Sequence, residues 1–176
     1  CLFVSIYEWN LMSKKKEYKI LGIIFLILSF YTASYLRNEM HGDYLYFILV
    51  LFICVFTDIG GYIFGKIFKG PKLTKLSPNK TYSGMVGSYL LSLVMMSIFF
   101  NSLVFFEKFN IDIELEEMSL NIFLLVLIVS TISQLGDIII SYFKRLSKIK
   151  DTGKIIPGHG GLLDRIDGMI FAFPFS

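Results

Sequence analysis

Three acidic residues near the end of the chain have the spacing and the surroundings of a magnesium site. Asp137 lies in an apolar stretch, whereas Asp164 and Asp167 follow a glycine-rich turn and, three residues apart, share one face of a predicted helix. Magnesium is usually held by one or two carboxylates, with water and substrate phosphates completing its octahedron. Consecutive amides in the turn that contains Gly160 and Gly161 can also point at anionic oxygens. These residues therefore predict chemistry on a phosphate group, with Mg²⁺ as the cofactor.

Asp137 lies about two helical turns before a basic pair, Lys144 and Arg145. A rise of 1.5 Å per residue puts Asp137 roughly 10 Å from Lys144, and Ser141 falls on the same side of the helix. An ionisable residue at this depth in a membrane helix is costly unless it faces a polar cavity or a partner, which makes a functional role the default interpretation. An ion pair with a neighbouring lysine is the competing explanation. We favour the functional role because a second acidic group follows in the sequence.

Basic residues beside these carboxylates suit a phosphate substrate. A phosphate monoester is already an anionic nucleophile, so an enzyme that acts on it needs positioning and charge neutralisation more than a strong base. Lys144, Arg145 and Lys150 can supply the positive charge. His159 stands between glycines, where it can orient a phosphate, cap a helix or act as a base, and these roles stay open.

The elements that must position these residues are membrane helices. Of the 176 residues, 55% are hydrophobic and 18% are charged, which is far more apolar than an ordinary soluble domain. A bilayer core needs about 20 apolar residues per helix. Four such stretches occur, at residues 18–36, 44–66, 85–106 and 119–143, and shorter apolar pieces stand at both ends. The sequence predicts an all-α, polytopic integral membrane protein with about four complete transmembrane helices plus partial ones at both ends.

The whole chain, 1–176, is predicted to be a single transmembrane catalytic domain. Its first residue is a cysteine followed by apolar residues and its last residues lie in an apolar stretch, so we expect both ends to be incomplete. The two cysteines, Cys1 and Cys54, are too few for a disulfide framework or a cysteine-based zinc site.

Charge alternates between the loops. The loops at about 66–84 and 144–165 are rich in lysine and arginine, whereas the loop from Glu107 to Glu117 is acidic with a single lysine. Because cytoplasmic loops carry the excess of Lys and Arg, we expect both basic loops and the active site to face the cytoplasm, in a bacterial-type inner (plasma) membrane.

Glycines in the second apolar stretch have two interpretations. The segment from Gly60 to Lys66 has the spacing of a phosphate-binding P-loop, but Ile67 stands where Ser or Thr is required and the segment reads as a membrane helix. We reject the P-loop. Gly61 and Gly65, four residues apart, instead predict a close helix-packing face.

A long run of polar residues and glycines surrounds the candidate site. Its defining members are Ser141, Phe143, Lys144, Arg145, Lys150, Asp151, Gly153, Ile156, Pro157, His159, Gly160, Gly161, Leu162, Asp164, Arg165, Ile166 and Asp167. This run resembles the signature of phosphatidate cytidylyltransferases at every defined position. Upstream, Gln134, Gly136 and Asp137 resemble the acidic site that precedes the signature, and the pair Glu8-Trp9 is similar to a motif near an earlier helix.

The resemblance implies an all-helical membrane enzyme, often dimeric, that joins CTP to phosphatidic acid and releases pyrophosphate. It implies Mg²⁺ as cofactor and leaves a second cation open. The implied roles are catalysis by Lys144, Arg145, Lys150, Asp151 and His159, substrate binding by Ser141, Gly160, Gly161 and Arg165, and metal binding by Asp137, Asp164 and Asp167.

The first basic loop resembles the other polar stretch of the same family. The matching residues are Asp58, Ser77, Pro78, Lys80 and Thr81. The resemblance implies that Asp58, Ser77, Lys80 and Thr81 bind substrate, with Lys80 and Thr81 on the nucleotide phosphates. Asn79 and Ser83 depart from the pattern, since the family usually has a lysine and an acidic residue at these positions.

Two other functions compete with this hypothesis. A CTP-dependent polyprenol or dolichol kinase would use related chemistry, but the long signature would be unexpected in it. A cation transporter would explain carboxylates inside the membrane but not the dense glycines and basic residues beside them. The predicted partners are CTP, phosphatidic acid, the lipid bilayer and a second copy of the chain in a homodimer, without nucleic acid.

Overall fold

The structure, a computed structural model, describes residues 1–13, 15–38, 45–74, 77, 79–105, 115–153, 155 and 160–176. Within these residues the named elements are all helices, and an isolated bridge joins Lys72 to Thr81. The elements are α1 (Leu2–Met12), α2 (Lys16–Asn38), α3 (Leu45–Phe68), α4 (Tyr82–Phe105), α5 (Leu115–Leu146), α6 (Leu163–Ala172) and the 3-10 helix η1 (Phe173–Phe175).

Four of these helices are long and apolar enough to cross a membrane. The candidate spans are Lys16–Asn38, Tyr46–Phe68, Tyr82–Asn101 and Leu120–Leu146. They overlap the four stretches expected from the sequence, and the shorter helices α1 and α6 take the places of the two partial ones. The predicted fold class is confirmed, and the chain is an integral membrane protein.

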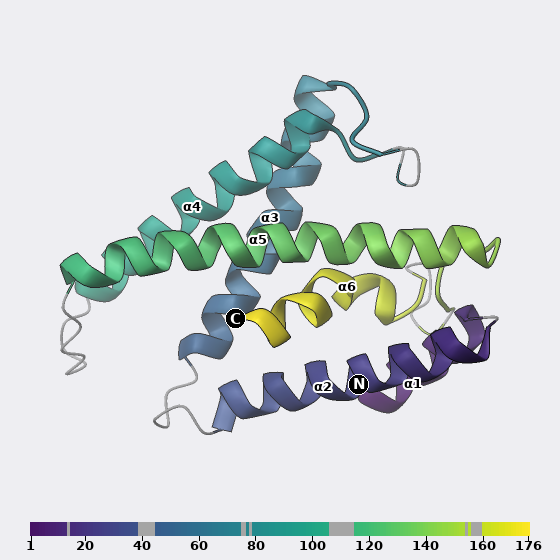
Figure 1. The fold of residues 1–176 in the computed structure, drawn as a ribbon. Helices are drawn as coiled ribbons and strands as arrows, with labels where there is room; N and C mark the ends of the chain where they lie inside the picture. The colour runs from purple at the N-terminus through teal and green to yellow at the C-terminus, as the bar shows by residue number, and fades with distance from the viewer. Residues whose placement is uncertain are drawn as a thin grey trace.

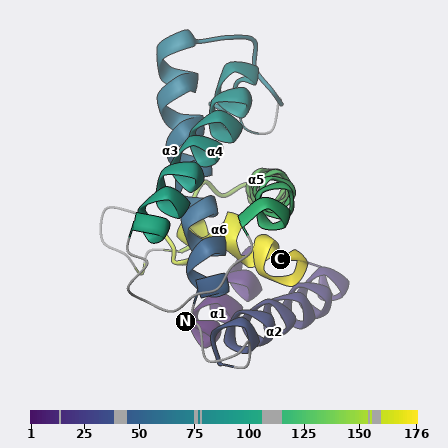
Figure 2. The same cartoon turned by 90° about the vertical axis from the view of Figure 1, so that its left-hand side faces the viewer.

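Helices α3 and α4 form a close antiparallel pair, and α5 crosses that pair (Figure 1). Figure 2 looks nearly along α5 and shows α3 and α4 on one side of it, with α1 and α2 on the other. The close approach of the pair depends on glycines. A Cβ added to Gly84 would stand 2.7 Å from the carbonyl oxygen of Gly61, and one added to Gly65 would stand 3.1 Å from Oγ1 of Thr81. The predicted glycine packing face is therefore confirmed, and the segment with P-loop spacing lies inside α3.

The ends of α3 and α5 and the starts of α2 and α4 lie toward the same side of the molecule (Figure 1). Both basic loops leave from that side. The loops are shorter than the sequence predicted, because α3 continues to Phe68 and α4 already begins at Tyr82. The additional helical turn of α3 is supported by stacking of Phe64 on Phe68, with ring centroids 5.8 Å apart.

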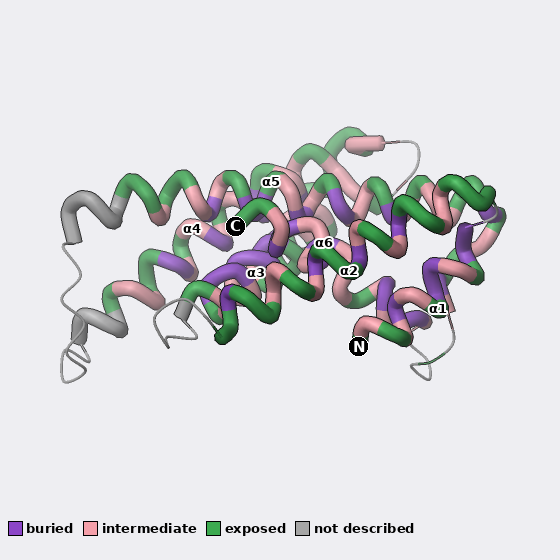
Figure 3. The backbone as a smooth tube through the Cα atoms, turned by 60° about the horizontal axis from the view of Figure 1, so that its bottom comes forward, coloured by how far each residue is buried: buried purple, intermediate pink, exposed green. Residues whose placement is uncertain are grey.

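Buried residues gather where α3 passes α5 and α6 (Figure 3). Ile53 of α3 and Val126 and Val129 of α5 are fully enclosed there. A second cluster, which includes Trp9 of α1 and Leu163 of α6, joins the shorter helices to α5 and α2. The outward faces carry many exposed large apolar side chains, as a surface in contact with lipid requires.

Candidate active site

The first basic loop brings Lys80 to Asp137 of α5. The Nζ atom of Lys80 lies 2.7 Å from Oδ2 of Asp137 and donates a hydrogen bond of 3.4 Å to the carbonyl oxygen of Gln134. The bridge between Lys72 and Thr81 holds the loop, and the N–H of Leu73 donates to the carbonyl oxygen of Lys80 at 2.7 Å. The ion pair that competed with a functional role for Asp137 is thus present.

A pocket of about 290 Å³, lined by both polar and apolar groups, lies beside this ion pair. Its lining includes Asp58, Ser77, Lys80, Thr81, Gln134 and Asp137. The structure therefore gathers all four substrate-binding residues predicted in and before the first basic loop around one cavity, together with one predicted metal ligand. Periodicity within a single helix cannot reveal this gathering, since Lys80 and Asp137 are 57 residues apart.

The second oxygen of Asp137 has no hydrogen-bond partner among the described residues. Oδ1 is buried, as are the equally unpartnered Oγ of Ser133 and Nε2 of Gln134. Helix α6 approaches closely here, because a Cβ on Gly168 would stand 3.1 Å from Oδ1 of Asp137. A buried anionic oxygen without a donor is costly and calls for a cation or a proton.

Asp167 of α6 adds a second negative charge to this place. Burial raises the pKa of Asp167 well above its ordinary value, and the charge of Asp137 raises it further. The N–H of Gly168 donates to Oδ1 of Asp167 at 3.0 Å. Two neighbouring carboxylates, one of them with an unpartnered oxygen, fit Mg²⁺, which prefers hard oxygen ligands and commonly takes one or two from the protein.

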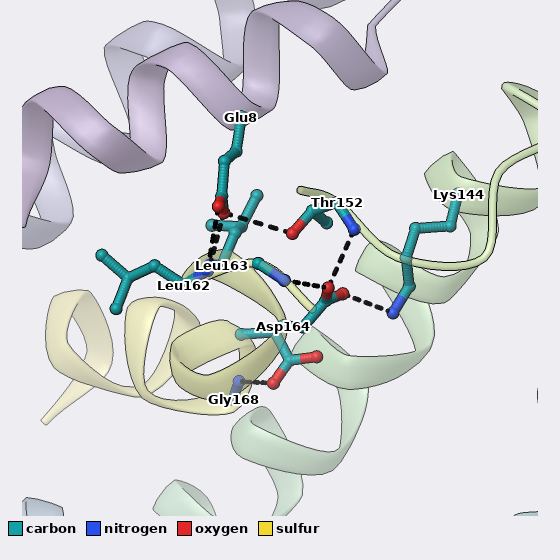
Figure 4. A network of polar contacts seen from close by, with 9 residues as sticks. Glu8, Lys144, Thr152, Leu162, Leu163, Asp164 and Gly168 are labelled. Atoms are coloured by element: carbon teal, nitrogen blue, oxygen red, sulfur yellow. Dashed lines mark hydrogen bonds and ion pairs between the residues drawn. The ribbon is translucent and has the colours of Figure 1, made fainter. Parts of the chain in front are cut away.

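Both oxygens of the Asp164 carboxylate instead have partners within the protein (Figure 4). Its Oδ1 lies 2.8 Å from Nζ of Lys144, and its Oδ2 accepts the N–H groups of Thr152 at 2.8 Å and Gly161 at 3.1 Å. Burial alone would raise the pKa of Asp164, but the hydrogen bond from Lys144 and the two N–H groups outweigh it and lower the pKa below its ordinary value.

The structure thus divides the predicted set of three metal ligands. Asp137 and Asp167 lie together, whereas Asp164 turns to Lys144 and the loop before α6. Among the described residues, no group of three or more His, Cys, Asp or Glu side chains is placed to hold one metal ion. Mg²⁺ binding stays a prediction, with Asp137 and Asp167 as the pair that fits it.

The remaining predicted site residues surround this network or the basic end of α5. Arg145, Lys150, Asp151 and Arg165 are exposed, Ser141 is half-buried and Gly161 is buried. Gly160 has φ +84°, and a Cβ there would stand 3.0 Å from Oδ2 of Asp164, so the position requires glycine. His159 lies outside the described residues.

Two residues without a predicted catalytic, substrate-binding or metal-binding role have well-defined places in the site. Thr152 is buried and bonds to Asp164, and Glu8 of α1 is fully buried against the start of α6. The available signal was an acidic residue inside an apolar segment, next to Trp9.

Comparison with known proteins places the chain in a family. Residues 2–176 match the model of the family described as "Cytidylyltransferase family". Similar proteins include the phosphatidate cytidylyltransferase of Staphylococcus haemolyticus, 42% identical over 135 residues, which are 76% of this chain and 48% of the relative. The phosphatidate cytidylyltransferase of Rickettsia felis is 34% identical over 171 residues, 95% of this chain and 72% of the relative.

The chain spans about half the length of the staphylococcal relatives, as in Staphylococcus saprophyticus, where 40% identity over 138 residues covers 49% of the phosphatidate cytidylyltransferase. The match nevertheless extends over α1 to α6 and so includes every element that forms the site. The chain belongs to the cytidylyltransferase family.

Proposed function

We propose that the chain contains the catalytic site of an enzyme that transfers CMP from CTP to phosphatidic acid, forming CDP-diacylglycerol and pyrophosphate. The observation that carries the proposal is the pocket where Lys80 meets Asp137, at the basic end of a helix bundle that matches the cytidylyltransferase family from residue 2 to residue 176. The names of the relatives support the choice of phosphatidic acid as acceptor.

In the proposed reaction, a phosphate oxygen of phosphatidic acid attacks the α-phosphorus of CTP. The bond from that phosphorus to the oxygen that bridges it to the β-phosphorus breaks, and pyrophosphate leaves with the bonding electrons. The attacking phosphate is already an anion, so the protein must mainly hold the two anions in line and offset their repulsion. We assign that task to Lys80, which lines the pocket, and to Lys144 at the end of α5.

The lipid reaches this site from the side. Its acyl chains stay against the exposed apolar faces of the helices, while its phosphate enters the pocket formed by α3, α4, α5 and the first basic loop. This geometry accounts for a polar cavity that contains Asp137 within a membrane helix, because the head group and the chains of one substrate need both environments.

Asp137 and Asp167 would hold Mg²⁺, which supplies positive charge to the triphosphate when it is bound. Asp137 offers its buried, unpartnered Oδ1, and Asp167 offers a second carboxyl group beside it, whose pKa is raised by burial and by the charge of Asp137. Lys80 offsets the charge of Asp137 and can instead face a phosphate. Asp164 orients Lys144.

We further propose that the basic end of the bundle faces the cytoplasm, where CTP is available, and that two copies form a homodimer. The first of these proposals is supported by two basic clusters. One is at the end of α3 and on the loop after it, with Lys66, Lys69, Lys72 and Lys80, and the other is at the end of α5 and after it, with Lys144, Arg145, Lys148 and Lys150. The second is supported only by the resemblance of the sequence signature.

The test uses the full-length protein with phosphatidic acid and CTP. With CTP labelled on the α-phosphate, label should enter the chloroform-soluble fraction, and excess EDTA should stop it. CTP labelled on the γ-phosphate should give no labelled lipid, since a kinase alone would transfer that group. Lipid labelled from the γ-phosphate, or undiminished product in EDTA, would contradict the proposal.

A further inference from the structure

Glu8, on α1, places a carboxylate with no exposed surface at the start of α6. Its Oε1 accepts the N–H of Leu162 at 2.9 Å, and its Oε2 accepts the N–H of Leu163 at 2.8 Å and the hydroxyl of Thr152 at 3.2 Å. Figure 4 shows Glu8 reaching down from α1 onto this turn. All three partners act as donors, so the position suits a carboxylate and not an amide.

These contacts make Glu8 the cap of α6. The first N–H groups of a helix have no partner within the helix, and negative charge is favoured at that end. The N-cap residue of α6, Leu162, has no side chain that can accept a hydrogen bond. The cap therefore comes from a different helix, and it ties the start of α6 to α1.

The loop before α6 leaves space for this carboxylate. A Cβ on Gly161 would stand 2.7 Å from Oε2 of Glu8, and one on Gly153 would stand 2.5 Å from Oε1. Both glycines belong to the run that carries the family resemblance. Their lack of a side chain keeps two stretches of backbone close around the acidic group of Glu8.

Thr152 connects the cap to the site. Its hydroxyl donates to Glu8, and its backbone N–H donates to Oδ2 of Asp164, whose Oδ1 receives Lys144. Asp167, three residues after Asp164 on α6, faces Asp137 of α5. The rotation and the height of α6 at its first turn thus decide where both acidic side chains stand.

Helix α1 is itself fixed in place. Trp9 donates from Nε1 to the carbonyl oxygen of Tyr18 at 3.0 Å and packs edge-on against Phe143 of α5, with ring centroids 4.9 Å apart. Ser147, after the end of α5, donates its hydroxyl to the carbonyl oxygen of Met12. These contacts hold α1, and with it Glu8, in a defined position relative to α2 and α5.

We infer that Glu8 is a positioning residue: it caps α6 from α1 and so holds Asp164 and Asp167 against Lys144 and Asp137. The inference rests on the proposed function for its catalytic consequence. Its structural part, that α6 depends on Glu8, can be measured without activity.

The experiment compares Glu8→Gln, Thr152→Val and Thr152→Ser with the wild type in the full-length protein. Glu8→Gln keeps the shape but turns an NH₂ group toward a backbone N–H. Thr152→Val removes the hydroxyl, and Thr152→Ser is the matched control that keeps it. Hydrogen exchange is followed in peptides that contain Leu162 and Leu163, with α4 peptides as an internal reference, and kcat and KM for CTP are determined.

We expect exchange at the start of α6 to become at least about tenfold faster in Glu8→Gln and faster in Thr152→Val, with α4 unchanged. Residues that orient the ligands of a metal site through hydrogen bonds typically contribute 10–100-fold to activity, so kcat should fall by roughly that factor in Glu8→Gln. The KM for CTP should stay within about threefold, because the pocket around Lys80 has no contact with Glu8. Thr152→Ser should resemble the wild type in both measurements.

The inference would be overturned if Glu8→Gln had the exchange rates of the wild type at the start of α6 and the kcat of the wild type. If Glu8→Gln does not fold, the same two wild-type results in Thr152→Val would overturn it. Equal losses in Thr152→Ser and Thr152→Val would also overturn it, since the hydroxyl would then not matter. If the wild type forms no CDP-diacylglycerol while exchange still responds to Glu8→Gln, the proposed function fails and the cap stands.

Discussion

The substitution Asp137→Asn separates a metal ligand from a residue that only forms an ion pair. Asparagine has nearly the volume of aspartate and keeps one acceptor oxygen, so packing between α5 and α6 should be preserved. What disappears is the negative charge that faces Lys80 on one side and Asp167 on the other.

The effect on stability should be small. The ion pair is partly accessible, with 27% of the Lys80 side chain and 18% of the Asp137 side chain exposed, and such a pair contributes up to about 1 kcal/mol. The substitution also removes the repulsion between Asp137 and the half-buried Asp167, which acts in the opposite direction. We therefore expect the free energy of unfolding to change by no more than about 1 kcal/mol.

The effect on turnover should be large. Residues that only support a metal site typically contribute 10–100-fold, so loss of a direct carboxylate ligand should lower kcat by more than about 100-fold. The mismatch between a small change in stability and a large change in kcat is the expected signature of a ligand.

The assay measures CMP incorporation into lipid over a range of Mg²⁺ concentrations, with thermal unfolding recorded on the same preparations. Glu17→Gln is the matched control, because Glu17 is an exposed acid in the first turn of α2 at the same end of the bundle. A folded Asp137→Asn variant with kcat within about threefold of the wild type would refute the assignment of Asp137 to the metal.

Three further predictions concern the ion pairs, the packing and the topology. Lys144→Met removes the cation that lowers the pKa of Asp164. The wild type should have a larger free energy of unfolding than Lys144→Met. This difference should be complete at pH 7, above the ordinary carboxyl pKa of about 3.9, and should vanish as the pH falls through the lowered pKa of folded Asp164. Gly84→Ala should lower the free energy of unfolding by about 1–3 kcal/mol, because its Cβ would meet the α3 backbone at 2.7 Å. In intact cells, a cysteine at Asn101 should react with an impermeant thiol reagent and one at Lys72 should not.

Each of these has a distinct contrary result. A difference in melting temperature between Lys144→Met and the wild type that is the same at pH 7 and pH 3 would mean that the pair with Asp164 does not stabilise the fold. Gly84→Ala should be compared with Ser97→Ala on the exposed face of α4, and equal stability of the two would contradict close glycine packing. If the reagent labelled only Lys72→Cys and not the cysteine at Asn101, the orientation of the protein in the membrane would be the opposite of the predicted one.

The membrane spans and the glycine packing face depend on local composition, and the sequence predicts both. The apolar stretches give the four spans to within a few residues, because length and hydropathy alone decide whether a helix can cross a bilayer. The four-residue spacing of Gly61 and Gly65 gives the packing face of α3. Helical periodicity likewise puts Asp137 and Lys144 on one helix, α5.

The sequence does not predict which distant groups meet. Periodicity says nothing about a loop lysine crossing to α5, so the contact of Lys80 with Asp137 appears only in the folded chain. For the same reason Asp164 and Asp167 look equivalent in sequence, although one is satisfied by Lys144 and backbone N–H groups and the other is not. The role of Glu8 depends on the packing of α1 against α6.

The sequence separation of 155 between Glu8 and Leu163 has a consequence for biosynthesis. A ribosome produces α1 well before α6, at a rate of about 5–20 residues per second, so roughly 8–30 seconds pass before the partners of the Glu8 carboxylate have been synthesised. During that interval it must be hydrated or protonated at the edge of the bilayer. The carboxylates of α6 can take their final places only after the four long helices have been synthesised, which makes the completed site a product of the late steps of membrane assembly.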